Sequence, residues 1–326
     1  MKFHYNPNLP FILPQCKGNL TLNGRFVNSQ HEEALDFDKY KQMLFYTNPQ
    51  KKEKSKDTFK PTIIDNTDVF HQKHNTIVWL GHSSFYIRID GTTFLTDPCL
   101  RSLPFFPRNV KLPYKLTEIQ NVDYILISHA HRDHFDVPSL KKILKANPNA
   151  EFLAPLGLGK LIKTVGTTNF QEAAWYQSYK ISNPNLKVHF LPAYHWHMRH
   201  PLDKNTMLWG SHFIASSSSR NIYFAGDTAY SSHFKEIGQI IPSIDICLMP
   251  IGAYKPTFLL KESHTSPQEA ITGFHELGGK LFIPMHYGTY DLADEPLGDP
   301  IQTLKQQAHK LKGKLAELPV GGDYKF

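Results

Sequence analysis

The chain has 326 residues, of which 40% are hydrophobic and 20% charged, with a formal net charge of +7. This is the composition of a soluble globular protein, long enough to bury a sizeable core in one large domain or two small ones. Its three cysteines are widely spaced without a Cys-x-x-Cys pair, which indicates neither a disulfide framework nor a zinc ribbon and favours a reducing compartment.

The sequence pattern also lacks targeting signals. Residues Met1–Leu13 have neither the charged region nor the long apolar region of a secretory signal, and no apolar run approaches the roughly 20 residues that a membrane helix needs. We therefore expect a cytoplasmic protein. The positive charge would suit an anionic partner such as nucleic acid, a phospholipid surface or a phosphate-bearing substrate, and it does not choose among them.

Residues 1–75 are predicted to form an extension packed on the main domain. They are rich in proline, and their hydrophobic residues show little regular periodicity. One helix is expected over Glu32–Leu44, and loose order is expected near the lysines of residues 51–60. The main domain, at residues 76–326, begins where the pattern changes to strands. The first strands are predicted at Ile77–Leu80, Phe85–Ile89 and Thr92–Thr96, with Asp90-Gly91 as a hairpin turn.

Strands and helices are both predicted in the rest of the chain. Further strands are expected at Val122–Ile127, Phe152–Ala154, Lys187–Leu191, Leu208–Ala215, Asn221–Ala225, Asp245–Met249 and Lys280–Pro284. Helices are expected at Pro138–Lys145, Leu158–Val165, Phe234–Ile240, Pro267–Leu277 and Ile301–Lys310. Ser266 and Glu269 form a capping-box pattern around Pro267. This order predicts an α/β sandwich in which two sheets pack together and helices cover their outer faces.

A run of metal-binding side chains follows the apolar stretch Val122–Ile127. It reads H-x-H-x-D-H, with ligands His129, His131, Asp133 and His134. Alternate side chains of an extended segment point the same way, so three of these groups converge while His134 turns toward a second point beside them. Mixed imidazole and carboxylate ligands are typical of catalytic metal centres, whereas structural zinc sites are usually rich in cysteine. The run therefore indicates a two-metal site.

Matching ligands are expected just past other predicted strands, and three residues meet that expectation. His195 follows the strand ending at Leu191, Asp227 follows the strand ending at Ala225, and His286 follows the strand ending at Pro284. Each alone would more often be an ordinary loop residue. Three together, each at the end of a strand, favour a shared site.

The sequence resembles the metallo-β-lactamase superfamily, and within it the branch that contains N-acylphosphatidylethanolamine-hydrolysing phospholipase D. The matching segments are residues 79–84, 95–98, 129–134, 195–196, 226–228, 264–270 and 285–289. The resemblance implies a metallo-β-lactamase-like αββα sandwich with an N-terminal extension. It also implies two divalent metal ions, expected to be Zn²⁺. The ligands that it implies are His129, His131 and His195 for one ion, Asp133, His134 and His286 for the other, and Asp227 between them.

Several neighbouring residues are candidates for supporting roles. Asp97 is expected to orient a ligand histidine or loop amides. His82 and His264 could enter the pocket as hydrogen-bond or proton donors, and a structural role for His82 is equally open. Arg132 stands where relatives of this branch often carry Tyr, and it could place a cation at the mouth of the site or face solvent. His197 and His200 are interpreted as surface or supporting residues.

The pattern predicts a hydrolase. Two cations sharing a water molecule would make hydroxide available near neutral pH, and the catalytic candidates are Asp133, Asp227 and His264. No G-x-S-x-G elbow, P-loop or dinucleotide-binding fingerprint occurs. The resemblance favours a phosphodiesterase of phospholipase D type that uses a metal-bridging hydroxide on a small or lipid-like phosphodiester.

Partners and alternatives stay open in the sequence. Contact with the inner face of a membrane is conceivable through the apolar segments 9–13, 103–106 and 258–260. No nucleic-acid partner is expected, and the oligomeric state is not indicated. The alternatives are a lactone or ester hydrolase or a nuclease of the same superfamily, and a non-hydrolytic diiron redox or sensor protein. His131 disfavours the last, because diiron relatives carry a carboxylate there.

Overall fold

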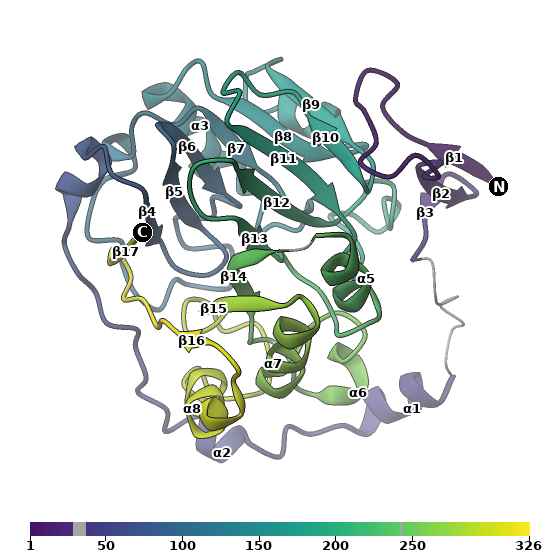
Figure 1. The fold of residues 1–326 in the computed structure, drawn as a ribbon. Helices are drawn as coiled ribbons and strands as arrows, with labels where there is room; N and C mark the ends of the chain where they lie inside the picture. The colour runs from purple at the N-terminus through teal and green to yellow at the C-terminus, as the bar shows by residue number, and fades with distance from the viewer. Residues whose placement is uncertain (29–36, 242) are drawn as a thin grey trace.

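Two seven-stranded β-sheets face each other at the centre of the computed structural model (Figure 1). The structure describes residues 1–28, 37–241 and 243–326. The first sheet contains, in spatial order, β17 (Asp323–Lys325), β4 (Thr76–Trp79), β5 (Phe85–Ile89), β6 (Thr92–Thr96), β7 (Tyr124–Leu126), β8 (Glu151–Pro155) and β9 (Phe170–Ala173). The second contains β10 (Gln177–Tyr179), β11 (Leu186–Leu191), β12 (Ser211–Ser216), β13 (Ile222–Phe224), β14 (Ile244–Pro250), β15 (Gly279–Met285) and β16 (Lys314–Leu315).

Shorter elements surround these two sheets. A three-stranded sheet near the N-terminus contains β1 (Lys2–His4), β2 (Asn19–Leu22) and β3 (Arg25–Phe26). The helices are α1 (Phe37–Phe45), α2 (Lys51–Lys54), α3 (Val137–Ala146), α4 (Gly159–Lys163), α5 (His233–Ile240), α6 (Thr257–Leu260), α7 (Pro267–Glu276) and α8 (Asp299–Gln307). Short 3₁₀ turns lie at Thr67–His71, Leu116–Glu118 and Ala308–Lys310.

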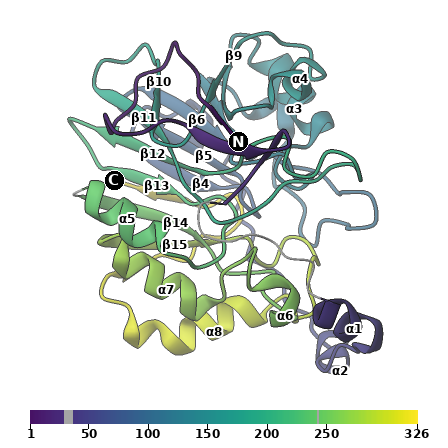
Figure 2. The same ribbon diagram turned by 90° about the vertical axis from the view of Figure 1, so that its right-hand side faces the viewer.

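Helices cover the outer face of each sheet and complete an αββα sandwich. Helices α3 and α4 lie against the first sheet, and α5, α7 and α8 lie against the second (Figure 2). Side chains of strand β4 pack on both faces of its sheet, because successive side chains of a strand point to opposite faces. Ile77 and Trp79 join the core between the sheets, whereas Val78 joins the core beneath the helices. The predicted α/β sandwich is confirmed.

The long buried elements match the predictions, and the short edge strands do not. All ten predicted strands and all five helices predicted in the main domain appear, with ends shifted by a few residues. Strands β9, β10, β16 and β17 were not predicted, because they are short and carry polar residues such as the Gln-Ser-Tyr of β10. The capping box at α7 forms as predicted, with the Ser266 hydroxyl accepting from the Glu269 amide and the Glu269 carboxylate accepting from the Ser266 amide.

The first 75 residues make two kinds of contact with the two-sheet unit. Residues 1–28 run beside the second sheet, where Phe11 forms a bridge with Gln177 of β10. Further along, the lysine-rich stretch that was expected to be loosely ordered contains helix α2, and Lys54 pairs with Asp291 at 2.5 Å. That expectation was wrong, because Lys54 is tied to the loop after β15. Part of the predicted helix over 32–44 lies outside the described residues, and α1 occupies the rest.

Within the described residues, no helix combines the length and the apolar character needed to cross a membrane.

Candidate metal centre

The candidate ligands gather where several strands of the two sheets end. The H-x-H-x-D-H run follows β7, Asp97 follows β6, and His195, Asp227 and His286 come after β11, β13 and β15. Loops at strand ends can converge without giving up the buried faces of the strands. The structure therefore brings together all seven residues that the sequence predicted as ligands.

The first group of ligands consists of three imidazoles. His129 Nε2 lies 2.9 Å from His131 Nδ1, and His195 Nε2 lies 3.2 Å from the same His131 nitrogen. His129 and His195 are almost fully buried, and His131 is partly exposed. Trp196 packs edge-on against His131 at 4.9 Å between ring centroids. Three nitrogens converging in this way match the histidine part of a zinc site.

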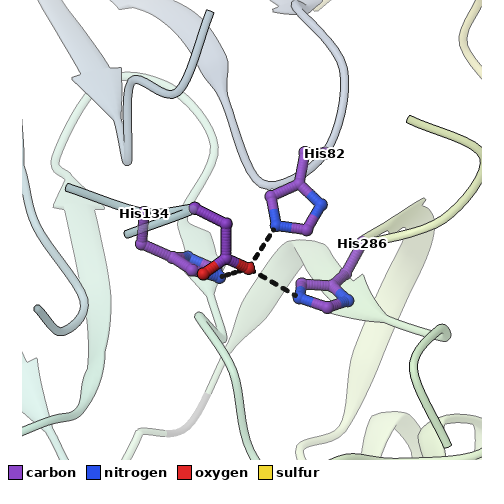
Figure 3. A group of neighbouring side chains, drawn as sticks. His82, His134 and His286 are labelled. Carbon is purple, nitrogen blue, oxygen red and sulfur yellow. Dashed lines mark hydrogen bonds and ion pairs between the residues drawn. The ribbon is translucent and has the colours of Figure 1, made fainter. Parts of the chain in front are cut away.

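The second group surrounds the carboxylate of Asp133. Figure 3 shows His82, His134 and His286 turned toward one carboxylate oxygen, and the ion-pair distances identify this atom as Oδ2 of Asp133. The distances from Oδ2 to the imidazole nitrogens are 3.0 Å for His82, 3.4 Å for His134 and 3.9 Å for His286. One atom from each of these four residues falls within 4.8 Å of the others.

Asp227 lies between the two groups. Its Oδ2 atom is 3.1 Å from Nε2 of both His134 and His286, and 4.0 Å from Nε2 of His129. One carboxylate oxygen thus approaches ligands of the first group and ligands of the second. This is the position in which a carboxylate can bridge two cations.

Asp97 orients the run of ligands from behind. Its Oδ2 lies 2.8 Å from His134 Nδ1, and its two oxygens accept hydrogen bonds from the amide and hydroxyl of Ser128 at 2.7 and 2.5 Å. The Ser128 hydroxyl in turn lies 2.9 Å from His129 Nδ1. A carboxylate on one ring nitrogen leaves the other nitrogen free for a metal ion. The geometry of Asp97 is therefore that of the orienting carboxylate that the sequence predicted.

His82 joins two loops of the second group. Its backbone amide donates to Thr289 Oγ1 at 2.7 Å, and its carbonyl accepts from the His286 amide at 3.2 Å. Its ring lies 4.1 Å from the His286 ring and within 3.0 Å of the Asp133 carboxylate. His82 and His286 both adopt left-handed backbone angles, with φ of 54° and 61°. His82 and Thr289 both lie in segments that carry the sequence resemblance, residues 79–84 for His82 and 285–289 for Thr289, but only His82 was given a possible role.

Burial keeps several of these imidazoles neutral. It lowers the pKa of His131 to about 4 and the pKa of His195 to about 3. Burial alone would lower the pKa of His134 as well, but the carboxylates of Asp227 and Asp133 raise it well above its ordinary value. Neutral imidazoles have the free lone pair that a metal ion requires.

The residues present fit a pair of divalent cations. Burial alone would raise the pKa values of Asp133 and Asp227, yet the charge of His134 holds both well below the ordinary value. The carboxylates of Asp133 and Asp227 thus both face His134, at a place where a cation could balance their charge. Among the described residues, Nε2 of His134, Nε2 of His286 and Oδ1 of Asp227 have no hydrogen-bond partner. The two nitrogens lie 3.1 Å from the other oxygen of Asp227, and a metal ion could satisfy all three buried atoms as its ligands.

The remaining candidates lie around the opening of the centre. The His264 side chain is 13% exposed, with Nδ1 3.8 Å from Asp227 Oδ2, and the Asp133 side chain is 18% exposed. Arg132 is exposed beside them. His197 is fully buried behind His131, so it is not a surface residue, whereas His200 is exposed.

The comparisons with known proteins agree with this fold and give the class of protein to which the chain belongs. Residues 92–287 match the beta-lactamase superfamily domain, which covers more than half of the chain. The chain therefore belongs to the metallo-β-lactamase superfamily, and it is a metal-dependent hydrolase of that superfamily. The predicted resemblance to the phospholipase D branch is confirmed.

Two relatives and one solved structure show what the chain is similar to. It is 31% identical over 240 residues to N-acyl-phosphatidylethanolamine-hydrolyzing phospholipase D 1 of Caenorhabditis elegans, covering 69% of this chain and 67% of that protein. It is 29% identical over 239 residues to the mitochondrial enzyme of the same name from Saccharomyces cerevisiae, covering 71% of this chain but only 51% of the yeast protein. Igni18, a metallo hydrolase of Ignicoccus hospitalis, shares the fold, with a TM-score of 0.59, 20% identity and coverage of 77% and 98%.

Proposed function

We propose that this protein is a binuclear phosphodiesterase of phospholipase D type that acts on a lipid-like phosphodiester. The observation that carries the proposal is the position of Asp227, whose Oδ2 approaches His129 on one side and His134 and His286 on the other. The similarity to the nematode phospholipase D over two thirds of each chain supports the phosphodiester substrate.

Each residue of the centre has a part in this chemistry. His129, His131 and His195 would hold one divalent ion, and Asp133, His134 and His286 the other, with Asp227 between them. Two such ions, expected to be Zn²⁺, supply Lewis-acid activation of water and neutralise charge on the phosphoryl oxygens.

In this proposal the side chains at the opening, together with the buried Asp227, face the attacking water and the substrate. Asp133 and Asp227 accept hydrogen bonds from the attacking water and so orient it toward phosphorus. Burial lowers the pKa of His264 to about 3, which leaves a neutral ring that donates one hydrogen bond to a substrate oxygen. Exposed Arg132 lies beside the opening, where its positive charge would attract a phosphate group.

A lipid substrate also fits the exposed apolar side chains in two segments that lie next to residues of the centre in the sequence. Phe105 is 98% exposed and Phe106 41% exposed, in the loop that follows Asp97. Leu259, in α6, is 39% exposed. It precedes Leu260, whose carbonyl accepts a hydrogen bond from the His264 amide. We include in the proposal that these side chains contact the surface of a lipid bilayer while the phosphodiester enters the centre.

An assay with the zinc-loaded protein tests the proposal. The protein should hydrolyse an N-acylated phosphatidylethanolamine presented in vesicles, whereas it should not hydrolyse a lactone or a single-stranded RNA. His131→Ala and Asp227→Ala should abolish turnover, and His309→Ala, which changes an exposed histidine outside the centre, should leave it unchanged. Undiminished turnover in the first two variants would reject the chemistry. Turnover of the lactone or the RNA alone would instead assign the centre to another reaction.

A further inference from the structure

An arginine in the loop that follows His195 donates hydrogen bonds to the backbone of the H-x-H-x-D-H run. Arg199 Nη1 donates to the Ala130 carbonyl at 2.7 Å and to the Phe135 carbonyl at 3.1 Å. Ala130 lies between His129 and His131, and Phe135 directly follows His134, so the two carbonyls lie within and just after the ligand run. Both residues are fully buried, and the guanidinium also lies 5.8 Å from the Phe135 ring.

The backbone around Arg199 is itself held in place. Asp203 Oδ1 accepts hydrogen bonds from the amides of Arg199 and His200, both at 2.9 Å. His197 and Asn205 exchange two further bonds, because the Asn205 amide donates to the His197 carbonyl and the His197 amide donates to the Asn205 side chain. These bonds close the loop on itself and fix the point from which the arginine side chain leaves it.

The N-terminal extension supports the same loop from its other side. Arg25 donates to the carbonyls of Leu202 and Lys204, and the Phe26 amide donates to the Asn205 carbonyl at 2.7 Å. The Asn28 side chain donates to the carbonyl of His195 itself at 2.9 Å. The matched superfamily region begins at residue 92, so these contacts come from outside it.

We propose that Arg199 is a positioning residue for the first metal ion, and that it sets the distance between the loop of His195 and the loop of His129 and His131. The first group draws its three ligands from these two loops. Arg199 belongs to the loop of His195, and its side chain donates hydrogen bonds directly to the backbone of the loop of His129 and His131. The second group has separate support, because Asp97 holds His134 and His82 holds Asp133. Arg199 therefore acts mainly on the first ion.

The direction in which metal affinity changes when Arg199 is replaced separates a positioning role from a purely electrostatic one. Arg199 carries a positive charge close to a site for cations, so removal of that charge alone would tighten metal binding. Loss of the two carbonyl contacts would instead let the loops move apart and weaken binding at the first group. Substitutions of residues that orient metal ligands weaken metal affinity by about 10- to 100-fold. We expect weakening of that size in Arg199→Met, which keeps an apolar stem against Phe135.

Metal affinity, measured apart from activity, tests the proposal, which rests on the metal ligands of the proposed function. Wild type and variants are stripped of metal and titrated with Zn²⁺ against a chromophoric chelator, and Co²⁺ spectra report the two ions separately. Arg101→Met is the matched control, because Arg101 contacts Asp136 Oδ2 at 2.9 Å beyond the ligand run and touches neither carbonyl. Arg199→Lys, which keeps a charged donor, should give an intermediate affinity.

The outcomes are distinct. Loss of affinity for one ion of two in Arg199→Met, with both retained in Arg101→Met, supports the proposal. Unchanged affinity, tighter binding, or an equal loss for both ions would overturn it. If Arg199→Met does not fold, Arg199→Lys decides, and two ions bound as tightly as in wild type would overturn it. A wild-type protein that binds no metal would instead overturn the proposed function.

Discussion

The two ligand groups of the centre are held by different means. The first is made of three imidazoles from two loops. Arg199 joins these loops through a backbone carbonyl of the ligand run, and Asn28 of the extension holds the backbone carbonyl of His195. The second contains Asp133, whose carboxylate and neighbouring imidazoles are held by the side chains of Asp97 and His82. The first group therefore depends on how its loops are placed, and the second on hydrogen bonds to its own ligands.

Asp227 should be the one residue whose loss removes both ions. Asp227→Ala takes away the oxygen that approaches both groups, whereas His131→Ala removes a ligand of the first group alone. We expect turnover to fall by about 1000-fold or more in each, equivalent to about 4 kcal/mol of transition-state stabilisation. Metal analysis separates them, with neither ion retained tightly in Asp227→Ala and one retained in His131→Ala. Two ions retained in Asp227→Ala would contradict the bridging position.

Asp97→Asn should weaken the second ion more than the first. Asp97 contacts His134 directly but reaches His129 only through Ser128. Loss of an orienting carboxylate lowers metal affinity by about 10- to 100-fold. Competition titration with a chelator measures the two constants, and Asp123→Asn is the control, because Asp123 accepts from the Thr93 amide away from the centre. A larger loss of affinity for the first ion than for the second would contradict the role of Asp97 as the support of the second group.

Acid should destabilise the fold through histidines of the core as well as those of the centre. Burial lowers the pKa of His212, in β12, to about 3, against 6.5 for the ordinary side chain. Between these values the unfolded chain binds a proton that the folded chain does not, so stability falls as pH falls below 6.5. At pH 5 the penalty from His212 alone is about 2 kcal/mol.

His212→Leu separates this effect from metal loss. Its free energy of unfolding should fall by about 2 kcal/mol less than that of the wild type between pH 7 and pH 5. The comparison between pH values cancels any constant cost of the substitution, and denaturant unfolding of the metal-free proteins provides the measurement. Equal losses in both proteins would assign the acid sensitivity to the centre instead.

The structure brings the predicted ligand residues together, and each of them has a local signal in the sequence. The spacing of the H-x-H-x-D-H run, and the position of His195, Asp227 and His286 just past strands, can be seen without any knowledge of the fold. Arg199 has no such signal. Its role depends on two carbonyls about 65 residues earlier in the chain, and a backbone acceptor leaves no trace in the residue type. The edge strands β9 and β17 are similar, because pairing partners define them more than their own composition does.

The smallest expected effect concerns the approach of the substrate. Phe105 is 98% exposed in the loop after Asp97, and Phe3, in β1 of the extension, is 51% exposed. If Phe105 contacts the bilayer, Phe105→Ser should raise KM for a vesicle substrate by about 3- to 10-fold, up to about 1.4 kcal/mol, because less apolar area is buried. Turnover of a soluble phosphodiester should stay the same, and Phe3→Ser should change neither. Equal effects of Phe105→Ser on both substrates would show that Phe105 supports the structure of its loop. Contact with the lipid surface would then have to come from other side chains.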